Sequence, residues 1–470
     1  MDYDDAVVGA GPNGLTAAAV LARAGRRVLV VDAAPTIGGG ARTDSAFGAG
    51  TRRDVCSAVH PTGFVSPAFA DLDLTAHGLR WLLPEYSLVH GYGPEHVLGL
   101  ARDRGARDAE LGREARAWER TVGWAGHAPG LVADVLNAPA LPRRPVAAAR
   151  FAAAAGLPTA ALVRGAFRTP PVRTLFAAVA AHSARPLSAA GSAAPGLLLA
   201  ALAGSGWPVA RGGSQAITEA LASVVRAHGG TIETDCPISG FEQLSRGARL
   251  FFDTSPRVLR AVMGERLPAW YRRRLDGFAY GPGTCKVDFL LSEPIPWRDA
   301  RYAATATFHL ARDVRQVVVT EAEVADGRIP VRPWVLGGEP TRIDPSRAPA
   351  GAHLAWAYCH VPAGCTEDMS AAITAEIERC APGFRDVIVG QIVTTAAEQE
   401  RYNANNIGGD IGCGATSLTQ LMRRPVVSAV PQATPVPGVY LCSAATAPGG
   451  GVHGMSGYRA ALHALAADRP

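Results

Sequence analysis

The feature that most constrains the fold is a glycine pattern near the N-terminus, between a short apolar segment and an alanine-rich one. Gly9, Gly11 and Gly14 form a GxGxxG motif that follows residues 3–8 and begins residues 14–24. The first glycine of such a motif allows a tight turn, the second lets a pyrophosphate approach the backbone, and the third lets helix and strand pack closely. The pattern therefore predicts a strand, a turn and a helix whose N-terminus faces a phosphate.

An acidic residue completes this unit. Asp32 ends a second apolar segment, residues 27–32, at the place where a carboxylate accepts hydrogen bonds from an adenosine ribose. The same carboxylate disfavours a ribose 2′-phosphate, and hence NADP. The sequence thus predicts a dinucleotide site, supported by a strand, a helix and an acid in addition to the glycines.

A second glycine cluster favours FAD over NAD. Residues 38–40 are three glycines, and Arg42 and Thr43 come soon after them. Such a loop closes over the same pyrophosphate, and Arg42 is available to pair with it. NAD-dependent dehydrogenases have no need of this element.

A third glycine run lies near the C-terminus, in residues 448–455, between an expected strand at 439–442 and an expected helix at 453–467. No second acid-terminated β-α-β unit follows it. We therefore expect its backbone N–H groups to face the pyrimidine edge of a flavin, where negative charge develops on reduction.

Hydrophobic patterning indicates an α/β chain whose nucleotide-binding elements return in three segments. We predict a three-segment Rossmann-type FAD-binding domain formed by residues 1–70, 205–275 and 420–470. An inserted substrate domain, a helical part plus an antiparallel sheet, is expected in residues 71–204 and 276–419. The expected elements after residue 70 are short helices over 75–205, a helix at 214–228, strands at 231–234, 250–253, 285–291, 315–320 and 353–360, and a helix at 370–380.

Composition excludes several other classes of protein. The net charge is +5 with basic residues spread along the chain, whereas nucleic-acid binding needs a clustered basic face. Eight scattered cysteines without a CxxC pair predict neither a disulfide framework nor a metal site. A strand that begins by Tyr3 leaves no room for a signal peptide, and the apolar stretches fall short of the roughly 18 residues that span a bilayer. We expect a cytoplasmic protein, for which peripheral membrane contact is still open.

These motifs together resemble the FAD-dependent phytoene desaturase and flavin amine oxidase superfamily, in particular its phytoene dehydrogenase-like members. The resemblance covers essentially the whole chain. The stretches that carry it are VVGAGPNGLTAA, IGGGARTDSAF, CSAVHP, GGSQAITEALA and YLCSAATAPGGGVHGMSGYRAA. It implies a non-covalently bound FAD that contacts all three segments.

The motifs and the resemblance together give a set of candidate cofactor-binding residues. They are Gly9, Gly11, Pro12, Asn13, Gly14, Asp32, Ala33, Gly38, Gly39, Gly40, Arg42, Thr43, Ser57, Val59, Cys236, Ile238, Thr254, Gly450, Gly451, Val452, His453 and Met455.

Two residues are candidates for catalysis. Lys286 is the sole lysine among 46 basic residues, and its stretch resembles the amine oxidase strand in which a lysine holds a water near flavin N5. A lysine is a compact point charge that an arginine does not replace. His453 lies in the C-terminal glycine run and is expected near the flavin ring. His60 and His360 also stay open as residues that face the flavin, although a lone histidine is more often a structural residue.

The resemblance implies a desaturase or dehydrogenase, in which hydride passes from a C–H bond of a hydrophobic small molecule to the flavin. Molecular oxygen or a quinone would then reoxidise the flavin. Three alternatives stay open: a flavin amine oxidase, which Lys286 favours, a redox-neutral isomerase that uses reduced FAD, and a non-catalytic binding protein that FAD stabilises.

We predict that the purified protein is yellow and releases free FAD on heat denaturation, because no Cys or His lies in a recognisable flavinylation motif. The measurement is the flavin absorbance of the supernatant after the protein has precipitated. Flavin that stays with the precipitate would reveal a covalent bond.

Overall fold

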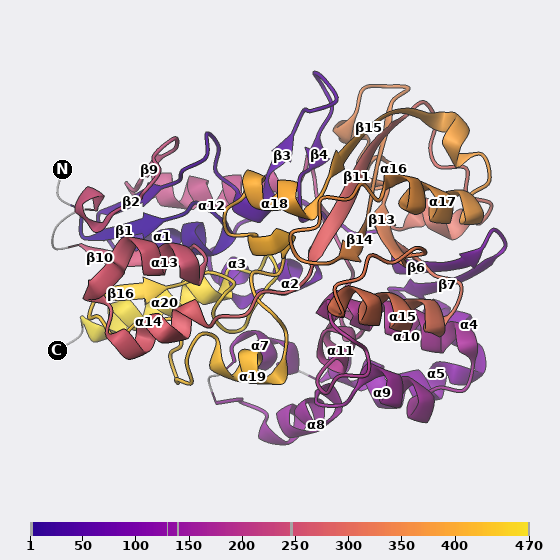
Figure 1. Cartoon of the computed structure of the whole chain (residues 1–470), viewed down its shortest axis with the longest axis horizontal. Coiled ribbons are helices and arrows are strands. Elements are labelled where there is room, and N and C mark those ends of the chain that lie inside the picture. The colour runs from indigo at the N-terminus through magenta and orange to yellow at the C-terminus, as the bar shows by residue number, and fades with distance from the viewer. Residues whose placement is uncertain (1–2, 129, 139–140, 245–247, 469–470) are drawn as a thin grey trace.

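A parallel sheet and a mainly antiparallel sheet organise two regions of the chain. The computed structural model describes residues 3–128, 130–138, 141–244 and 248–468. In Figure 1 the parallel sheet lies on the left with both termini, and the second sheet lies on the right above a group of helices. The chain crosses between the two regions several times.

Five described strands form the parallel sheet, and they come from three distant stretches of the chain. Their order is β16 (Val439–Leu441), β10 (Arg249–Phe252), β1 (Asp5–Val8), β2 (Val28–Val31) and β9 (Thr231–Glu233). All neighbouring pairs are parallel. The predicted α/β class and the three-segment Rossmann-type region are therefore confirmed.

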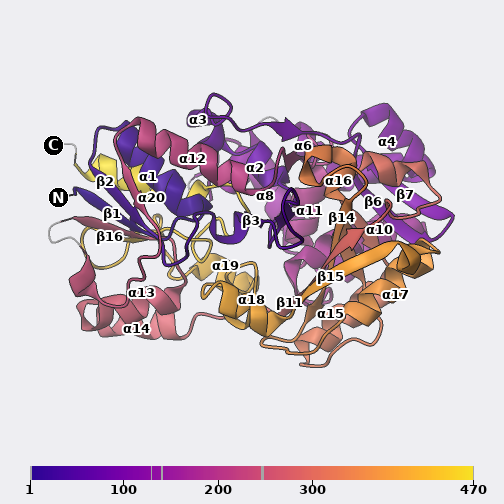
Figure 2. The ribbon, with the colours of Figure 1, turned by 90° about the horizontal axis from the view of Figure 1, so that it is seen from above.

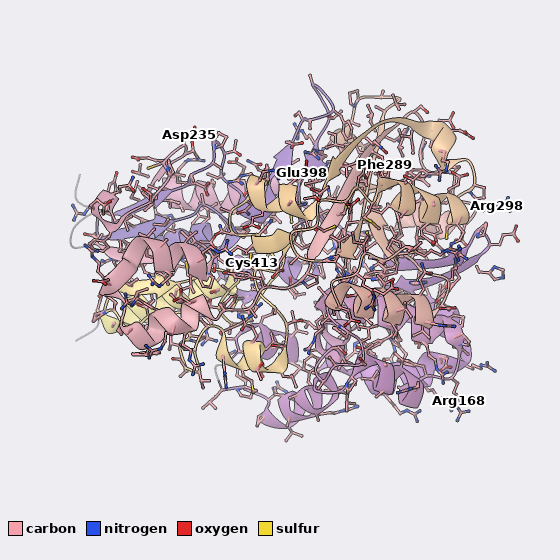
Figure 3. The ribbon with its side chains drawn as sticks, viewed as in Figure 1. Arg168, Asp235, Phe289, Arg298, Glu398 and Cys413 are labelled. Atoms are coloured by element: carbon pink, nitrogen blue, oxygen red, sulfur yellow. The ribbon has the colours of Figure 1, made fainter. Side chains whose placement is uncertain are left out.

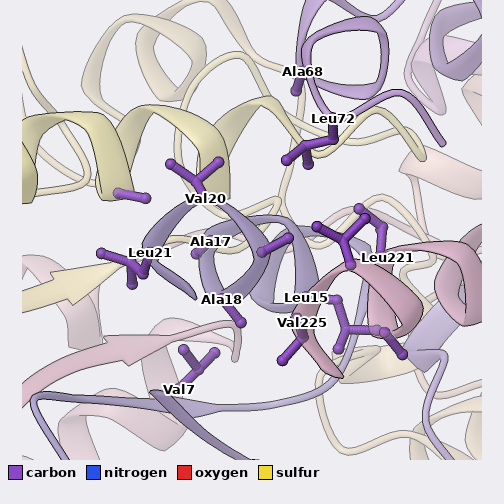
Figure 4. Close-up of a cluster of buried hydrophobic side chains, with 14 of the residues drawn as sticks. Val7, Leu15, Ala17, Ala18, Val20, Leu21, Ala68, Leu72, Leu221 and Val225 are labelled. Carbon is purple, nitrogen blue, oxygen red and sulfur yellow. The ribbon is translucent and has the colours of Figure 1, made fainter. Parts of the chain in front are cut away.

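Helices cover both faces of this sheet. One face packs against α1 (Pro12–Arg23), α12 (Gln215–Ala227) and α20 (Met455–Ala467), and the other packs against α13 (Pro256–Met263) and α14 (Ala269–Asp276). Figure 2 shows α13 and α14 on the side opposite α1 and α12. Figure 4 shows how Leu15, Val20 and Leu221 pack in the first of these two cores, where small alanines let α1 lie close to its neighbours.

The second sheet contains seven described strands. Their order is β15 (Ile388–Thr394), β11 (Gly283–Leu291), β14 (His353–Val361), β13 (Val335–Gly338), β12 (Phe308–Leu310), β6 (Tyr86–Gly93) and β7 (His96–Ala101). All pairs are antiparallel except β12 with β6. Helix α17 (Ser370–Cys380) covers one face, and α15 (Val314–Ala325) and α10 (Pro170–Ala180) cover part of the other.

One expected strand is a helix. Residues 315–320 are among the runs expected to be extended from alternating apolar and polar residues, but they belong to α15. Asp313 caps this helix, since its side chain accepts a hydrogen bond from Gln316 N at 2.9 Å. Val317, Glu321 and Val324 recur at helical spacing and are buried. Packing against the second sheet therefore overrides the strand propensity.

The start of the expected helical part is instead extended. Residues 86–101 form the hairpin β6–β7, and Trp81–Leu82 is the short strand β5, paired with β8 (Val209–Ala210). Most of β6 is buried because it lies between β7 and β12. Its hydrogen-bond partners in β12 lie more than 200 residues away, so local periodicity could not reveal it.

The remaining elements are helices and one short hairpin. They are β3 (Thr43–Asp44), β4 (Arg53–Asp54), α2 (Pro61–Phe64), α3 (Pro67–Asp71), α4 (Arg104–Leu111), α5 (Ala115–Trp118), α6 (Trp124–His127), α7 (Leu131–Leu136), α8 (Pro145–Ala155), α9 (Thr159–Ala166), α11 (Ala193–Ala201), α16 (Pro340–Ile343), α18 (Ala396–Tyr402) and α19 (Leu418–Arg423).

In the described part of the chain no single helix has the length and apolar composition to cross a membrane. Helices α8 and α9, which are bent by 104° to each other, have the length and apolar composition of a membrane span only when they are taken together.

Candidate active site

A large cavity runs from the carboxyl edge of the parallel sheet to the second sheet. Its volume is about 1580 Å³. Gly11 and Asp32 line one end, Trp356 and His360 line the other, and Cys413 lies on the wall between them. Figure 3 shows Cys413 at the junction of the two regions. Pockets for one drug-sized ligand measure roughly 300–1,000 Å³, so this cavity has room for a dinucleotide and a second molecule.

The first turn of the GxGxxG motif is packed too tightly for any side chain. Gly9 has φ +104°, and a Cβ there would lie 2.6 Å from the carbonyl oxygen of Asp253. A Cβ on Gly14 would lie 2.1 Å from the carbonyl oxygen of Gly9. The backbone of Gly11 and the side chain of Asn13 consequently face the cavity at the N-terminus of α1. Asn13 Oδ1 is buried there and lacks a hydrogen-bond partner among the described residues, as expected of a group that meets a ligand.

Asp32 lies at the end of β2 on the cavity wall. Its Oδ2 accepts a hydrogen bond from Ala10 N at 2.7 Å, and its Oδ1 accepts one from Ala34 N at 2.9 Å. Oδ1 also accepts a bond from Arg42, so the second lone pair of Oδ2 is the acceptor that remains for a ribose. Arg42 donates to Asp32 Oδ1 at 3.2 Å and to Thr36 O at 3.0 Å. The contact of Arg42 with a pyrophosphate stays a prediction.

The sequence patterns did not single out Asp253, although it follows β10 at the same sheet edge. Its Oδ2 accepts a hydrogen bond from Gly14 N at 2.7 Å, and its side chain lines the cavity. Burial raises the pKa of this carboxyl to about 7, the bond from Gly14 opposes that rise, and nearby Asp32 adds to it. The carboxyl ends of parallel strands meet at one edge, and this rule could have pointed to Asp253.

The C-terminal glycine run lies on the cavity wall, but His453 does not. Gly450, Gly451 and Val452 line the cavity. His453 is buried behind them, and its Nδ1 accepts a hydrogen bond from Met455 N at 3.1 Å. Burial lowers its pKa to about 4, so the ring is neutral at physiological pH. His453 therefore lies behind the wall at the start of α20, and its expected place near the flavin ring stays a prediction.

The predicted cofactor residues fall into two groups. Those on the cavity wall are Gly9, Gly11, Pro12, Asn13, Asp32, Ala33, Gly39, Gly40, Arg42, Ser57, Val59, Cys236, Ile238, Thr254, Gly450, Gly451 and Val452. Gly14, Gly38, Thr43, His453 and Met455 pack behind it: Thr43 Oγ1, for example, donates to Asp54 Oδ1 at 2.8 Å. His60 is also buried, with Nε2 2.8 Å from Ser214 Oγ, and burial lowers its pKa to about 4.

Lys286 is in an ion pair rather than on the cavity wall. It lies on β11, and its ammonium group is ion-paired with Asp288 and donates to Asp54 O at 2.9 Å. Only 3% of Lys286 is exposed. Asp288 also binds Arg53 at 2.8 Å. In the structure Lys286 joins β11 to β4, and its expected contact with a water near flavin N5 stays a prediction.

Comparison with known proteins agrees with this arrangement. Residues 7–72 match the NAD(P)-binding Rossmann-like domain family. The chain is 26% identical to the rat pyridine nucleotide-disulfide oxidoreductase domain-containing protein 2, over 98% of this chain and 93% of that protein. Its fold matches an oxidoreductase from Methanosarcina mazei with a TM-score of 0.64, at 16% identity, over 98% and 99% of the two chains.

A cyclohexylamine oxidase from Brevibacterium oxydans has a TM-score of 0.58 to this chain, at 16% identity, over 99% and 98% of the two chains. The chain has the flavin amine oxidase fold. The predicted superfamily resemblance is confirmed at the level of the fold, and the predicted class of oxidoreductase agrees with the names of these proteins.

We predict that Lys286→Met destabilises the protein by about 3 kcal/mol, because it removes one of the two cations that pair with the buried carboxylate of Asp288 and the donor to Asp54 O. Lys286→Arg should not restore stability, since the planar guanidinium does not fit a point-charge site. Chemical denaturation measures both. The matched control is Arg298→Met, whose exposed ion pair with Glu95 should contribute less than about 1 kcal/mol. Equal stability of Lys286→Met and Arg298→Met would show that the buried pair does not hold the two strands.

Proposed function

We propose that the chain is an FAD-dependent dehydrogenase that oxidises a hydrophobic small molecule at a C–H bond. The observation that carries this proposal is the continuous cavity that joins the glycine turn before α1 to apolar walls in the second region. A cofactor at one end and a substrate at the other would meet inside it, shielded from water.

The residues at the first end fit FAD. The pyrophosphate would bind at Gly11 and Asn13, over the N-terminus of α1, and the ribose would bind Asp32. The loop at Gly40 and the C-terminal loop at Gly451 add contacts that NAD does not require. Bound FAD would supply the electron acceptor, and O₂ or a quinone would regenerate it.

The residues at the other end fit an apolar substrate. The side chains there are mostly aliphatic and aromatic. They include Phe151, Leu198, Leu199, Trp207, Leu336 and Trp356. Amine oxidation loses its main sequence argument, because Lys286 is ion-paired with Asp288 away from the cavity wall. Dehydrogenation or desaturation is therefore favoured.

All eight cysteines carry free thiols, which supports the expected cytoplasmic location, because reducing compartments keep thiols unpaired.

We expect the FAD-free protein to bind FAD more tightly than NAD⁺. We also expect hydrophobic alcohols or hydrocarbons, added in the absence of oxygen, to bleach the visible flavin absorbance of the FAD-loaded protein. Calorimetry and absorbance spectra measure the two effects. Bleaching by alkylamines alone would instead favour an amine oxidase. Turnover only after prior reduction would favour an isomerase, and tighter binding of NAD⁺ would contradict the cofactor assignment.

We predict that FAD affinity falls about tenfold from about pH 6 to about pH 8. Asp253, with a pKa of about 7, is neutral below this range and negative above it, next to the site for the phosphates. Ionisation therefore repels the cofactor, so affinity is high at low pH and is lost as the pH rises. Asp253→Asn should bind FAD with an affinity that is constant over this range. A wild-type affinity that is equally constant would mean that the cofactor does not sense Asp253.

A further inference from the structure

A buried acid–histidine pair lies at the substrate end of the cavity. His360, on β14, lines the cavity, and its Nδ1 lies 2.8 Å from Oε1 of Glu321, on α15. His360 is 4% exposed and Glu321 is 1% exposed. The same Oε1 accepts a hydrogen bond from Trp334 Nε1 at 2.7 Å. The carboxylate is therefore held in place by an indole and by an imidazole.

The hydrogen bonds of Glu321 indicate which ring nitrogen of His360 carries the proton and which carries the lone pair. An indole N–H only donates, so Glu321 Oε1 acts as an acceptor, and His360 Nδ1 is the protonated nitrogen that donates to it. Nε2 then carries a lone pair. Among the described residues Nε2 has no hydrogen-bond partner, and His360 contributes to the cavity wall. An oriented proton acceptor therefore lies at the substrate end.

Glu321 also borders a second, smaller cavity. This cavity has a volume of about 170 Å³, and its lining includes Glu321, Arg185, Tyr280 and Ser417. The other carboxylate oxygen of Glu321, Oε2, is buried without a partner among the described residues. A cavity of this size has room for a water where a polar group such as the Glu321 carboxylate borders it. Glu321 thus lies between the ring of His360 and this second cavity, which shares Gly281 and Thr416 with the wall of the main cavity.

We propose that His360 is the base that removes a hydroxyl proton from the substrate, and that Glu321 positions and stabilises it. This inference rests on the proposed function. The C–H bond of an H–C–O–H group breaks with its electron pair passing to the oxidised FAD, the O–H proton passes to His360 Nε2, and a C=O bond forms. Two electrons and two hydrogens leave the substrate, and the resulting imidazolium lies beside the Glu321 carboxylate.

The chemistry of imidazole identifies the substrate class. An imidazole is far too weak a base for an unactivated C–H bond, but it accepts a hydroxyl proton as hydride leaves the same carbon. The walls around it, including Leu336 and Trp356, are apolar. The substrate class is therefore an apolar molecule with a hydroxyl group at the carbon that is oxidised.

The first test uses the FAD-loaded protein and follows flavin reduction by 1-decanol without oxygen. His360→Gln should slow flavin reduction at least about tenfold, the scale of a positioned base, with FAD affinity unchanged. His353→Gln is the matched control, since it changes a histidine on the same strand that does not line the cavity. Reduction of His360→Gln at the wild-type rate would overturn the proposal.

The second test does not depend on turnover. Nitrogen-15 spectra of the histidine rings, assigned by comparison with His360→Gln, should show His360 protonated at Nδ1 alone. Addition of 1-decanol to the oxidised protein should shift the Nε2 signal. Glu321→Gln should give a mixture of the two neutral forms of His360, which is a change that loss of packing alone would not produce. A ring protonated at Nε2 in the wild type, or no shift with 1-decanol, would overturn the proposal.

The two tests also separate the proposal from the proposed function. If no hydrophobic compound reduces the wild-type flavin, the proposed function is wrong, and the ring spectra alone then decide whether His360 binds a hydroxyl group. If the wild type is reduced and His360→Gln is reduced equally fast, the proposed function stands and the role of His360 is wrong.

Discussion

The cavity depends on one buried carboxylate, that of Asp54. Its Oδ2 accepts a hydrogen bond from Arg347 at 2.6 Å, its Oδ1 accepts bonds from Ser214 N and Thr43 Oγ1 at 2.8 Å each, and its backbone oxygen accepts the bond from Lys286. Burial opposes the charge, but Arg347 holds the pKa of Asp54 below its usual value. A buried charge is tolerated only when its partners are in place. Four stretches that are distant in the sequence are thereby brought into one arrangement.

The contacts of Asp54 fix the position of a segment of the cavity wall that lies between the two sheets. The segment that follows Asp54 includes Cys56, Ser57 and Val59, all of which line the cavity. Ser214 Oγ donates to Ser57 O at 2.7 Å, so the start of α12 holds this segment against the parallel sheet. Lys286 holds the same segment against the second sheet. A lysine in that position therefore serves the cavity indirectly, through the backbone that forms its wall.

The elements that could be predicted from the sequence are those specified by neighbouring residues. The turn at Gly9 is recognisable from the strand before it and the helix after it, and α17 has the predicted bounds, Ser370–Cys380. Several of the misses involve distant partners. α15 has strand propensity but packs on the second sheet, β6 pairs with β12, and the pKa of Asp253 depends on burial beside Gly14. Lys286 stands out in the sequence as the sole lysine, but Asp54, whose backbone oxygen accepts its hydrogen bond, lies 232 residues away.

The two histidines at the substrate end show how a second hydrogen bond determines what a ring can do. His182 and His360 both line the cavity. His182 Nδ1 lies 2.9 Å from the carbonyl oxygen of Val179, and burial lowers its pKa to about 4. A backbone carbonyl orients a ring but carries no counter-charge, so a proton on His182 would be poorly stabilised. His360 faces the carboxylate of Glu321 instead, and this charge can compensate a proton taken up inside an apolar cavity. The two rings therefore differ because His360 has the carboxylate of Glu321 beside it and His182 does not. Glu321 lies on α15, the helix whose residues 315–320 were expected to form a strand.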